Sequence, residues 1–394
     1  MKYSSLRQNK IFLVLSSLKI TVGCLLLLFI LTFWGTIAQV ENGLFVAQQR
    51  YFHSFFFLAS GRFPFPGAQL VLWVLFVNLL SAAITRYRFE WNNLGILLIH
   101  FGLLTYFISA FVTFHCVQES QLTLMEGAGS NVSTAYHDWE LAVWQKTEGN
   151  KNGVIAYDIS RESVGKIFLL TGDGFNIKVE EYYPNAVAYL SDVKQRPNTI
   201  NDSGITTLKS TPGKRDPEKN IPGGIFEAQF GQSQVRKLLL YGGEDYPAKV
   251  VIQDREYFVQ LRKKRFVMPF LLTLKDFKME VHPNTQVAKS YESLVQVKNG
   301  DMERDVLISM NHPLRYKNFT FYQASYAIDA LGREMSTLAV VKNFGRVLPY
   351  VASLITFLGL VTHFLGMGFS KKMGSTVRCS ELRRSGKSVK QGSK

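Results

Sequence analysis

The stretch NNLGILLIHFGLLTYFISAFVTF, residues Asn92–Phe114, decides the fold class of this chain. It holds 23 residues without a single Asp, Glu, Lys or Arg. Because a membrane-crossing helix needs about 20 predominantly apolar residues, this stretch predicts a transmembrane helix. One ionisable side chain, His100, lies within it. An ionisable group at membrane depth is costly and by default marks a functional site, while an interhelical hydrogen bond is an equally weighted alternative.

Three other uncharged runs are long enough to cross a membrane with some tilt. They are Ile20–Val40, Phe63–Thr85 and Val347–Phe369. The long segment between the third and fourth runs, His115–Gly345, is large enough to bury a core of its own. The sequence therefore predicts a membrane protein with four transmembrane helices, three N-terminal and one C-terminal, and a large domain between the third and the fourth.

Basic residues predict the orientation of these helices. They gather in the N-terminal segment 1–19, in the loop that carries Arg86 and Arg88, and in the tail 370–394. The positive-inside rule assigns these segments to the cytoplasm. The domain at 115–345 is then extracytoplasmic, between a three-helix region at 20–114 and a fourth helix at 346–369. The net charge of +15 arises partly from the tail, which we expect to contact anionic lipid rather than nucleic acid.

The segment 115–345 has the pattern of a β-rich domain. Short β-branched or aromatic runs alternate with turn residues such as Asn299-Gly300. This spacing predicts a sandwich or a barrel-like fold. Residues 198–224, rich in Pro, Gly, Asn, Asp, Ser and Lys, predict a flexible insertion or boundary. The expected strands are Val250–Ile252, Tyr257–Leu261, Phe270–Leu274, Phe277–Val281, Leu294–Val297, Asp305–Ile308, Thr320–Tyr322 and Leu338–Val341.

Familiar catalytic patterns do not occur in the sequence. The cysteines Cys24, Cys116 and Cys379 form no C-x-x-C, haem-attachment or zinc motif. No P-loop, dinucleotide-binding, zinc-protease or nucleophile-elbow pattern occurs either. The chain is therefore not itself a thiol oxidoreductase or a c-type cytochrome. We interpret the remaining histidines without a partner at ligand spacing as packing or turn residues; they include His53, His282 and His312.

Several motifs of this chain resemble those of the ResB/CcsB proteins, a family of cytochrome c biogenesis. The most specific block is MNHPLRY at Met310–Tyr316, followed by FYQASY at Phe321–Tyr326. Further similar motifs extend the resemblance over nearly the whole chain: Ser17–Lys19, Ile99–Gly102, Pro269–Leu272, Asp276-Phe277, Gly345 and Leu348-Pro349.

The resemblance implies a subunit of a complex that moves haem across the bacterial cytoplasmic (inner) membrane and attaches it to apocytochrome c. Family members act with CcsA, also called ResC, whose tryptophan-rich haem-binding segment this chain lacks. In fused versions of the pair, an intramembrane histidine helps to ligate haem, and His100 matches it. The resemblance therefore implies haem b as a transient ligand shared with the partner, His100 as its axial ligand, and a non-autonomous part of a holocytochrome c synthase. It leaves open a thiol-reducing, thioredoxin-like partner.

Helical spacing gives the span around His100 two distinct faces. At about 100° per residue, Leu103 and Phe107 share the face of His100. Gly95, Gly102 and Ser109 form a stripe of small residues on the opposite face, and such stripes let transmembrane helices approach closely. We therefore expect the helix to pack within its own bundle through the stripe and to offer His100 to haem or a partner.

The other intramembrane histidine, His363, is an alternative metal ligand that the sequence does not favour. Small residues share its helix face, which indicates packing and an interhelical hydrogen bond rather than ligation. A site formed by both His100 and His363 stays open, because topology puts both in the inner half of the bilayer. The small residues are Ala352, Thr356, Gly359 and Gly366.

Two other classes of function compete with haem handling. In a transporter subunit, His100 would relay protons, but four spans without helix-breaking repeats or paired intramembrane acids make a poor translocation path. In a membrane-anchored sensor, the outer domain would bind a ligand, but such a protein needs no ionisable residue in its third span. The haem-handling interpretation accounts for more of the sequence.

Overall fold

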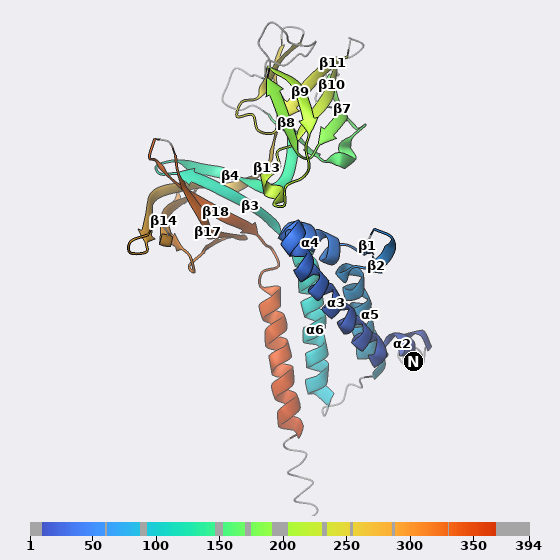
Figure 1. Ribbon diagram of the computed structural model, residues 1–394. Coiled ribbons are helices and arrows are strands. Elements are labelled where there is room, and N and C mark those ends of the chain that lie inside the picture. The colour runs from blue at the N-terminus through green and yellow to red at the C-terminus, as the bar shows by residue number, and fades with distance from the viewer. Residues whose placement is uncertain are drawn as a thin grey trace, which may run out of the picture. The chain divides into compact units, whose positions relative to one another are not determined.

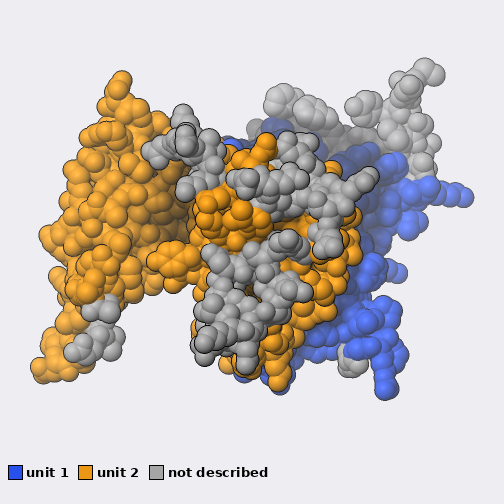
Figure 2. Space-filling model, turned by 90° about the horizontal axis from the view of Figure 1, so that it is seen from above, with its two compact units in different colours: residues 1–117, 343–394 blue, residues 118–342 orange. Residues whose placement is uncertain are grey.

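The computed structural model describes residues 10–59, 61–86, 93–145, 153–169, 175–190, 204–230, 235–252, 255–285, 288–329 and 331–367. The chain forms two compact units, one of residues 1–117 with 343–394 and the other of residues 118–342 (Figure 2). The first unit is mainly helical, and the second is built mainly of strands (Figure 1).

Within its described residues, the helical unit contains four helices that are long and apolar enough to cross a membrane. Three precede the strand-rich unit in the chain and one follows it, as the sequence predicts. They are α3 (Leu18–Asn42), α5 (Ala68–Arg86), α6 (Leu94–Cys116) and the C-terminal helix Leu348–Met367. The shorter elements are α2 (Lys10–Leu15), α4 (Leu44–Ala47), a π-helical turn η1 (Gln48–Phe52), and a hairpin of β1 (Phe56–Ala59) and β2 (Phe63–Pro66).

The second long helix begins after the Pro/Gly start of its uncharged run. The uncharged run starts at Phe63, yet Phe63–Pro66 forms β2 and pairs with β1. Pro64 and Pro66 explain the difference, because proline has no N–H and disfavours helical backbone in the residue before it. The helix therefore follows the Pro/Gly start of this run and covers Ala68–Arg86.

The stripe of small residues on α6 packs as the sequence predicts. Gly95, Gly102 and Ser109 are the buried residues of this helix. A Cβ added at Gly95 would lie 2.5 Å from the backbone nitrogen of His363. A Cβ at Gly102 would lie 2.8 Å from the backbone nitrogen of Thr356. The C-terminal helix therefore lies against this face of α6, and the glycines allow the approach.

Substitution of Gly102 tests this packing. Gly102→Leu should lower the free energy of unfolding of the helical unit by about 1–3 kcal/mol, because the new side chain overlaps the C-terminal helix. Gly23→Leu on α3 is the matched control, since a Cβ at Gly23 meets nothing within 4 Å. Titration with a denaturing detergent, followed by circular dichroism, measures both. Equal stabilities for the two variants would contradict the packing of α6 on the C-terminal helix.

The strand-rich unit is built from antiparallel pairs. Its largest sheet has ten strands and contains the path β15-β14-β13-β4-β3-β18-β17-β16. A four-stranded sheet has the order β11-β10-β7-β6, and β8 pairs with β9. The strands are β3 (Gln118–Met125), β4 (Gly129–Gln145), β5 (Ile155–Ile159), β6 (Ile167–Leu169), β7 (Phe175–Tyr183), β8 (Ala186–Leu190), β9 (Ile205–Ser210), β10 (Gly223–Phe230), β11 (Arg236–Tyr241), β12 (Ala248–Ile252), β13 (Arg255–Val281), β14 (Ala288–Asn299), β15 (Met302–Ser309), β16 (Leu314–Tyr316), β17 (Phe319–Ile328) and β18 (Glu334–Lys342).

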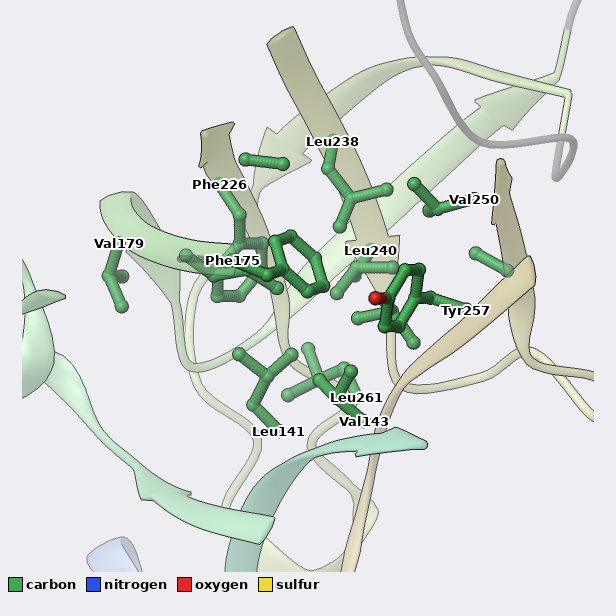
Figure 3. Packing of buried hydrophobic residues seen from close by; sticks show 14 of the residues in the cluster. Leu141, Val143, Phe175, Val179, Phe226, Leu238, Leu240, Val250, Tyr257 and Leu261 are labelled. Carbon is green, nitrogen blue, oxygen red and sulfur yellow. The ribbon is translucent and has the colours of Figure 1, made fainter. Parts of the chain in front are cut away.

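One long strand, β13, connects two hydrophobic cores. Its first half contributes Tyr257 and Leu261 to a core in which Tyr257 meets Phe175, with ring centroids 5.1 Å apart (Figure 3). Its second half contributes Phe270 and Leu272 to the other core. The sequence predicts three separate strands where β13 runs without a break, and this prediction is wrong. Shifts of register, one of them between Val267 and Leu272 around Pro269, let a long strand bend without ending.

The segment 198–224, predicted as a flexible insertion or boundary, includes strand residues at both ends of its described part. Residues 198–203 lie outside the described residues. Of the residues that follow, Ile205–Ser210 form β9 and Gly223 begins β10, whereas residues 211–222 form a connection that holds the short 3-10 turn Pro217–Lys219. Ile205 and Leu208 are buried in a small core with Leu239. Turn-forming composition misleads here because two apolar side chains in a polar segment are enough to anchor a short strand.

Candidate functional site

The helix α6 carries the intramembrane histidine that the sequence singles out. The Nδ1 atom of His100 lies 2.9 Å from the carbonyl oxygen of Ile96, one turn earlier on the same helix. A carbonyl oxygen can only accept, so Nδ1 carries the proton and donates it to this hydrogen bond. The neutral imidazole then has its lone pair on Nε2, the arrangement of a metal-ligating histidine whose other nitrogen is fixed by a hydrogen bond.

His100 faces a cavity of about 370 Å³ inside the helical unit. Apolar side chains form most of its wall, and α6 contributes Leu103 and Phe107 beside His100, as helical spacing predicts. The remaining lining residues come from the α2–α3 junction, from α3 and from α5: Ser16, Leu18, Thr21, Leu25, Leu75, Asn78, Leu79 and Ala82.

A buried asparagine, which sequence reasoning missed, fixes the polar part of this wall. Asn78 on α5 is 4% exposed. Its Oδ1 accepts a hydrogen bond of 2.7 Å from the Thr21 hydroxyl. Its Nδ2 donates to the backbone carbonyls of Leu15 and Ser17. Asn78 therefore ties α5 to the chain at the α2–α3 junction, and a polar residue inside an uncharged span was the sequence signal for it.

The chemistry of this cavity suits a ligand that brings most of its own metal donors. Among the described residues, no three His, Cys, Asp or Glu side chains gather into a metal site. A haem iron receives its equatorial nitrogens from the porphyrin and takes an axial imidazole from the protein. One oriented Nε2 in a mainly apolar wall therefore fits an iron porphyrin held through a single protein ligand.

The structure does not bring His363 together with His100. His363 lies against Gly95 on the small-residue face of α6, whereas His100 faces the cavity toward α3 and α5. The ring of His363 packs on Phe364, with centroids 5.7 Å apart. It makes no hydrogen bond with a described residue, so the interhelical hydrogen bond that the sequence favours is not seen within the described part of the chain.

Other residues from the sequence have structural surroundings. His282 lies in the turn after β13, and His312 forms an isolated bridge with Ser309. His53 packs edge-on against Phe114, with ring centroids 4.8 Å apart. Cys24 is buried and Cys116 exposed, while Cys379 lies outside the described residues.

The block Met310–Tyr326 contributes to the second core of the strand-rich unit. Phe319 and Phe321 pack edge-on against Phe270. Gln323 forms a buried network with two serines, in which Ser293 donates to its Oε1 at 2.8 Å and its Nε2 donates to Ser336 at 2.9 Å. These contacts give the block a structural role, in agreement with its strand-and-turn chemistry.

A half-buried histidine on β4 gave no signal in the sequence. His137 lies 3.8 Å from a carboxylate oxygen of Glu218. Burial lowers the pKa of His137, and Glu218 opposes this shift. Burial also lowers the pKa of Lys263, whose Nζ lies 4.9 Å from the centre of the Trp139 ring. The two basic groups are thus held in a partly desolvated cluster on neighbouring strands.

The fold and the cavity together define a class of protein: four helices long and apolar enough to cross a membrane, a large antiparallel β domain, and an imidazole beside a cavity in the helical unit. Residues 231–341 match the model of the ResB-like family. The matched range contains the motifs at Pro269–Leu272 and Met310–Tyr326, so the resemblance to ResB proteins is confirmed there.

A curated relative matches over a shorter stretch. Protein NrfI of Wolinella succinogenes is 29% identical over 100 residues, which is 25% of this chain and 11% of that protein. The match therefore spans about a tenth of the relative's length.

Proposed function

We propose that this chain is the ResB-like subunit of a membrane complex that carries haem across the bacterial cytoplasmic membrane and attaches it to apocytochrome c. The match to the ResB-like family supports the role in cytochrome c biogenesis. Haem is the cargo of the complex, and the strand-rich unit lies on the extracytoplasmic side, as the distribution of basic residues predicts.

The orientation of His100 is the observation that carries the proposal. The Nδ1–H group of His100 is used in the hydrogen bond to the Ile96 carbonyl oxygen. The ring nitrogen with a lone pair for a metal is therefore Nε2. Most of the cavity wall beside this nitrogen is apolar, and an apolar shell around a metal ligand limits the access of water to the metal. His100 would supply one axial ligand, and a histidine of a CcsA-like partner would supply the other.

The need for a partner protein follows from the fact that His100 is a single axial ligand. One imidazole completes one side of haem b, so the chain acts as a non-autonomous subunit that shares the porphyrin with its partner. The partner contributes the tryptophan-rich segment, apocytochrome c receives the haem, and a thioredoxin-like protein keeps the acceptor thiols reduced.

The absorption spectrum of the complex tests this function. We expect the full chain, co-expressed with a CcsA-like partner and purified in detergent, to show a Soret band of bound haem. His100→Ala should lower the haem content per complex by the equivalent that this cavity holds, because its axial ligand is lost. His363→Ala is the matched control and should keep the band. A full Soret band in the His100→Ala complex would contradict the proposal.

A further inference from the structure

Aromatic side chains line a second cavity of the helical unit, of about 520 Å³. The cavity lies between α5 and α6, near the end of α6 that leads into Cys116, and seven of its lining residues are Phe, Trp or Tyr. Trp73 is central to this wall, since its ring meets Phe76 and Phe111 edge-on at centroid distances of 5.9 and 5.6 Å. Such a wall offers ring edges and faces to a flat, apolar ligand.

An imidazole completes this aromatic wall. His115 lines the same cavity and packs between two phenylalanines of its own helix. Its ring centroid lies 4.4 Å from that of Phe111 and 5.0 Å from that of Phe114. No hydrogen bond joins the His115 ring to another described residue. A neutral imidazole at an aromatic cavity has the chemistry of an axial ligand for a porphyrin iron.

The two cavities lie along α6 and share one lining residue. Phe107 lines both, with His100 on one side and Phe111 and His115 on the other. His115 follows His100 by 15 residues, so the two imidazoles are about 22 Å apart along the helix axis. That separation is too long for both to ligate one iron, and it suits two successive sites.

We propose that the outer cavity is a second binding site for an iron porphyrin, with His115 as its axial ligand and Phe107 as the partition between the sites. The inference rests on the proposed function of His100, because both sites would hold the same cargo. A lipid acyl chain is the competing occupant of an apolar groove between helices. The acyl chain would leave the imidazole without a role, whereas a metalloporphyrin uses both the aromatic rings and the imidazole.

Titration with Fe(III) protoporphyrin IX tests the outer site in the full chain, reconstituted in phosphatidylcholine nanodiscs. The His100→Ala chain should still bind one equivalent and quench the fluorescence of Trp73, identified by its loss in Trp73→Phe. Adding His115→Ala should weaken this binding at least tenfold. His363→Ala in the same background is the matched control and should leave it unchanged.

A second variant separates loss of the ligand from loss of the fold. Ala110 lines the outer cavity and is exposed, so Ala110→Trp should fill the cavity without disturbing buried packing. It should block the binding seen in the His100→Ala background and leave the His100 site of the otherwise wild-type chain intact. Binding at the outer site is measured in a chain that lacks His100. Its result therefore does not depend on whether His100 binds haem at the inner site.

Three results would overturn the inference. The first is a His100→Ala chain that binds no porphyrin, and the second is a His115→Ala substitution without effect in that background. The third concerns the competing occupant: quenching of Trp73 by phosphatidylcholine with brominated acyl chains, together with porphyrin binding in the His100→Ala background that Ala110→Trp leaves unchanged, would identify the cavity as a lipid groove.

Discussion

Cells in which His100 is replaced by leucine should fail to mature cytochrome c, although the protein itself inserts and folds. Leucine is favourable at membrane depth and similar in size to the imidazole, so it preserves insertion and fills the space. It removes the Nε2 lone pair and the donor that bonds to Ile96. Since outer partners of a metal ligand alone change affinity by about 10–100-fold, loss of the ligand should lower holocytochrome c by about 100-fold or more.

Haem staining of membrane c-type cytochromes measures this effect in cells without another copy of the gene. His363→Leu is the control, because it changes an intramembrane imidazole that faces Gly95 rather than the cavity. His100→Ala should regain part of its function when imidazole is added to the medium, since the small base can enter the space left by the side chain. Normal maturation in the His100→Leu strain would make His100 a packing residue.

The helical part of this fold could be predicted from the sequence because length and apolarity are local properties. The runs that form α3 and α6 could be recognised without information on the rest of the chain. The spacing of Gly95, Gly102 and Ser109 also predicted which face of α6 is buried. The start of the second helix could not be read from apolarity alone. Phe63–Pro66 is as uncharged as the helix that follows, and its pairing with β1 depends on a segment earlier in the chain.

The cavity and the strand-rich unit depend on long-range contacts that no local pattern reveals. Helical spacing predicted that Leu103 and Phe107 lie beside His100. Asn78, in contrast, is held at the site by hydrogen bonds to Thr21 and Ser17, which lie 57 and 61 residues earlier in the chain. In the same way, β13 continues through Pro269 because β4 and β14 pair along its sides. The turn residues in the sequence predicted that this strand would break, whereas pairing with its neighbours lets it continue through β-bulges.

A buried ion pair on β4 and β13 should give the largest stability change in the strand-rich unit. Arg262 Nε donates to Glu140 Oε1 at 2.8 Å, and the side chains are only 13% and 6% exposed. The Arg262 guanidinium also lies 5.7 Å from the centre of the Trp144 ring. Glu140→Leu would leave this cation buried without its carboxylate, and such a change typically costs about 3–5 kcal/mol.

Replacement of both partners should undo most of that loss, because the desolvation penalty of the orphaned cation disappears with the cation. We therefore expect Glu140→Leu/Arg262→Met to be more stable than Glu140→Leu alone, as replacement of buried pairs by apolar residues is often neutral. Asp305→Ala is the surface control: its pair with Lys275 has side chains that are 48% and 38% exposed, so it should cost less than about 1 kcal/mol. Urea unfolding of the detergent-solubilised chain, followed by tryptophan fluorescence, measures all three, and Trp144 reports on the pair itself. If Glu140→Leu costs no more than Asp305→Ala, Arg262 finds solvent or another partner when its carboxylate is removed, and the pair does not hold β4 to β13.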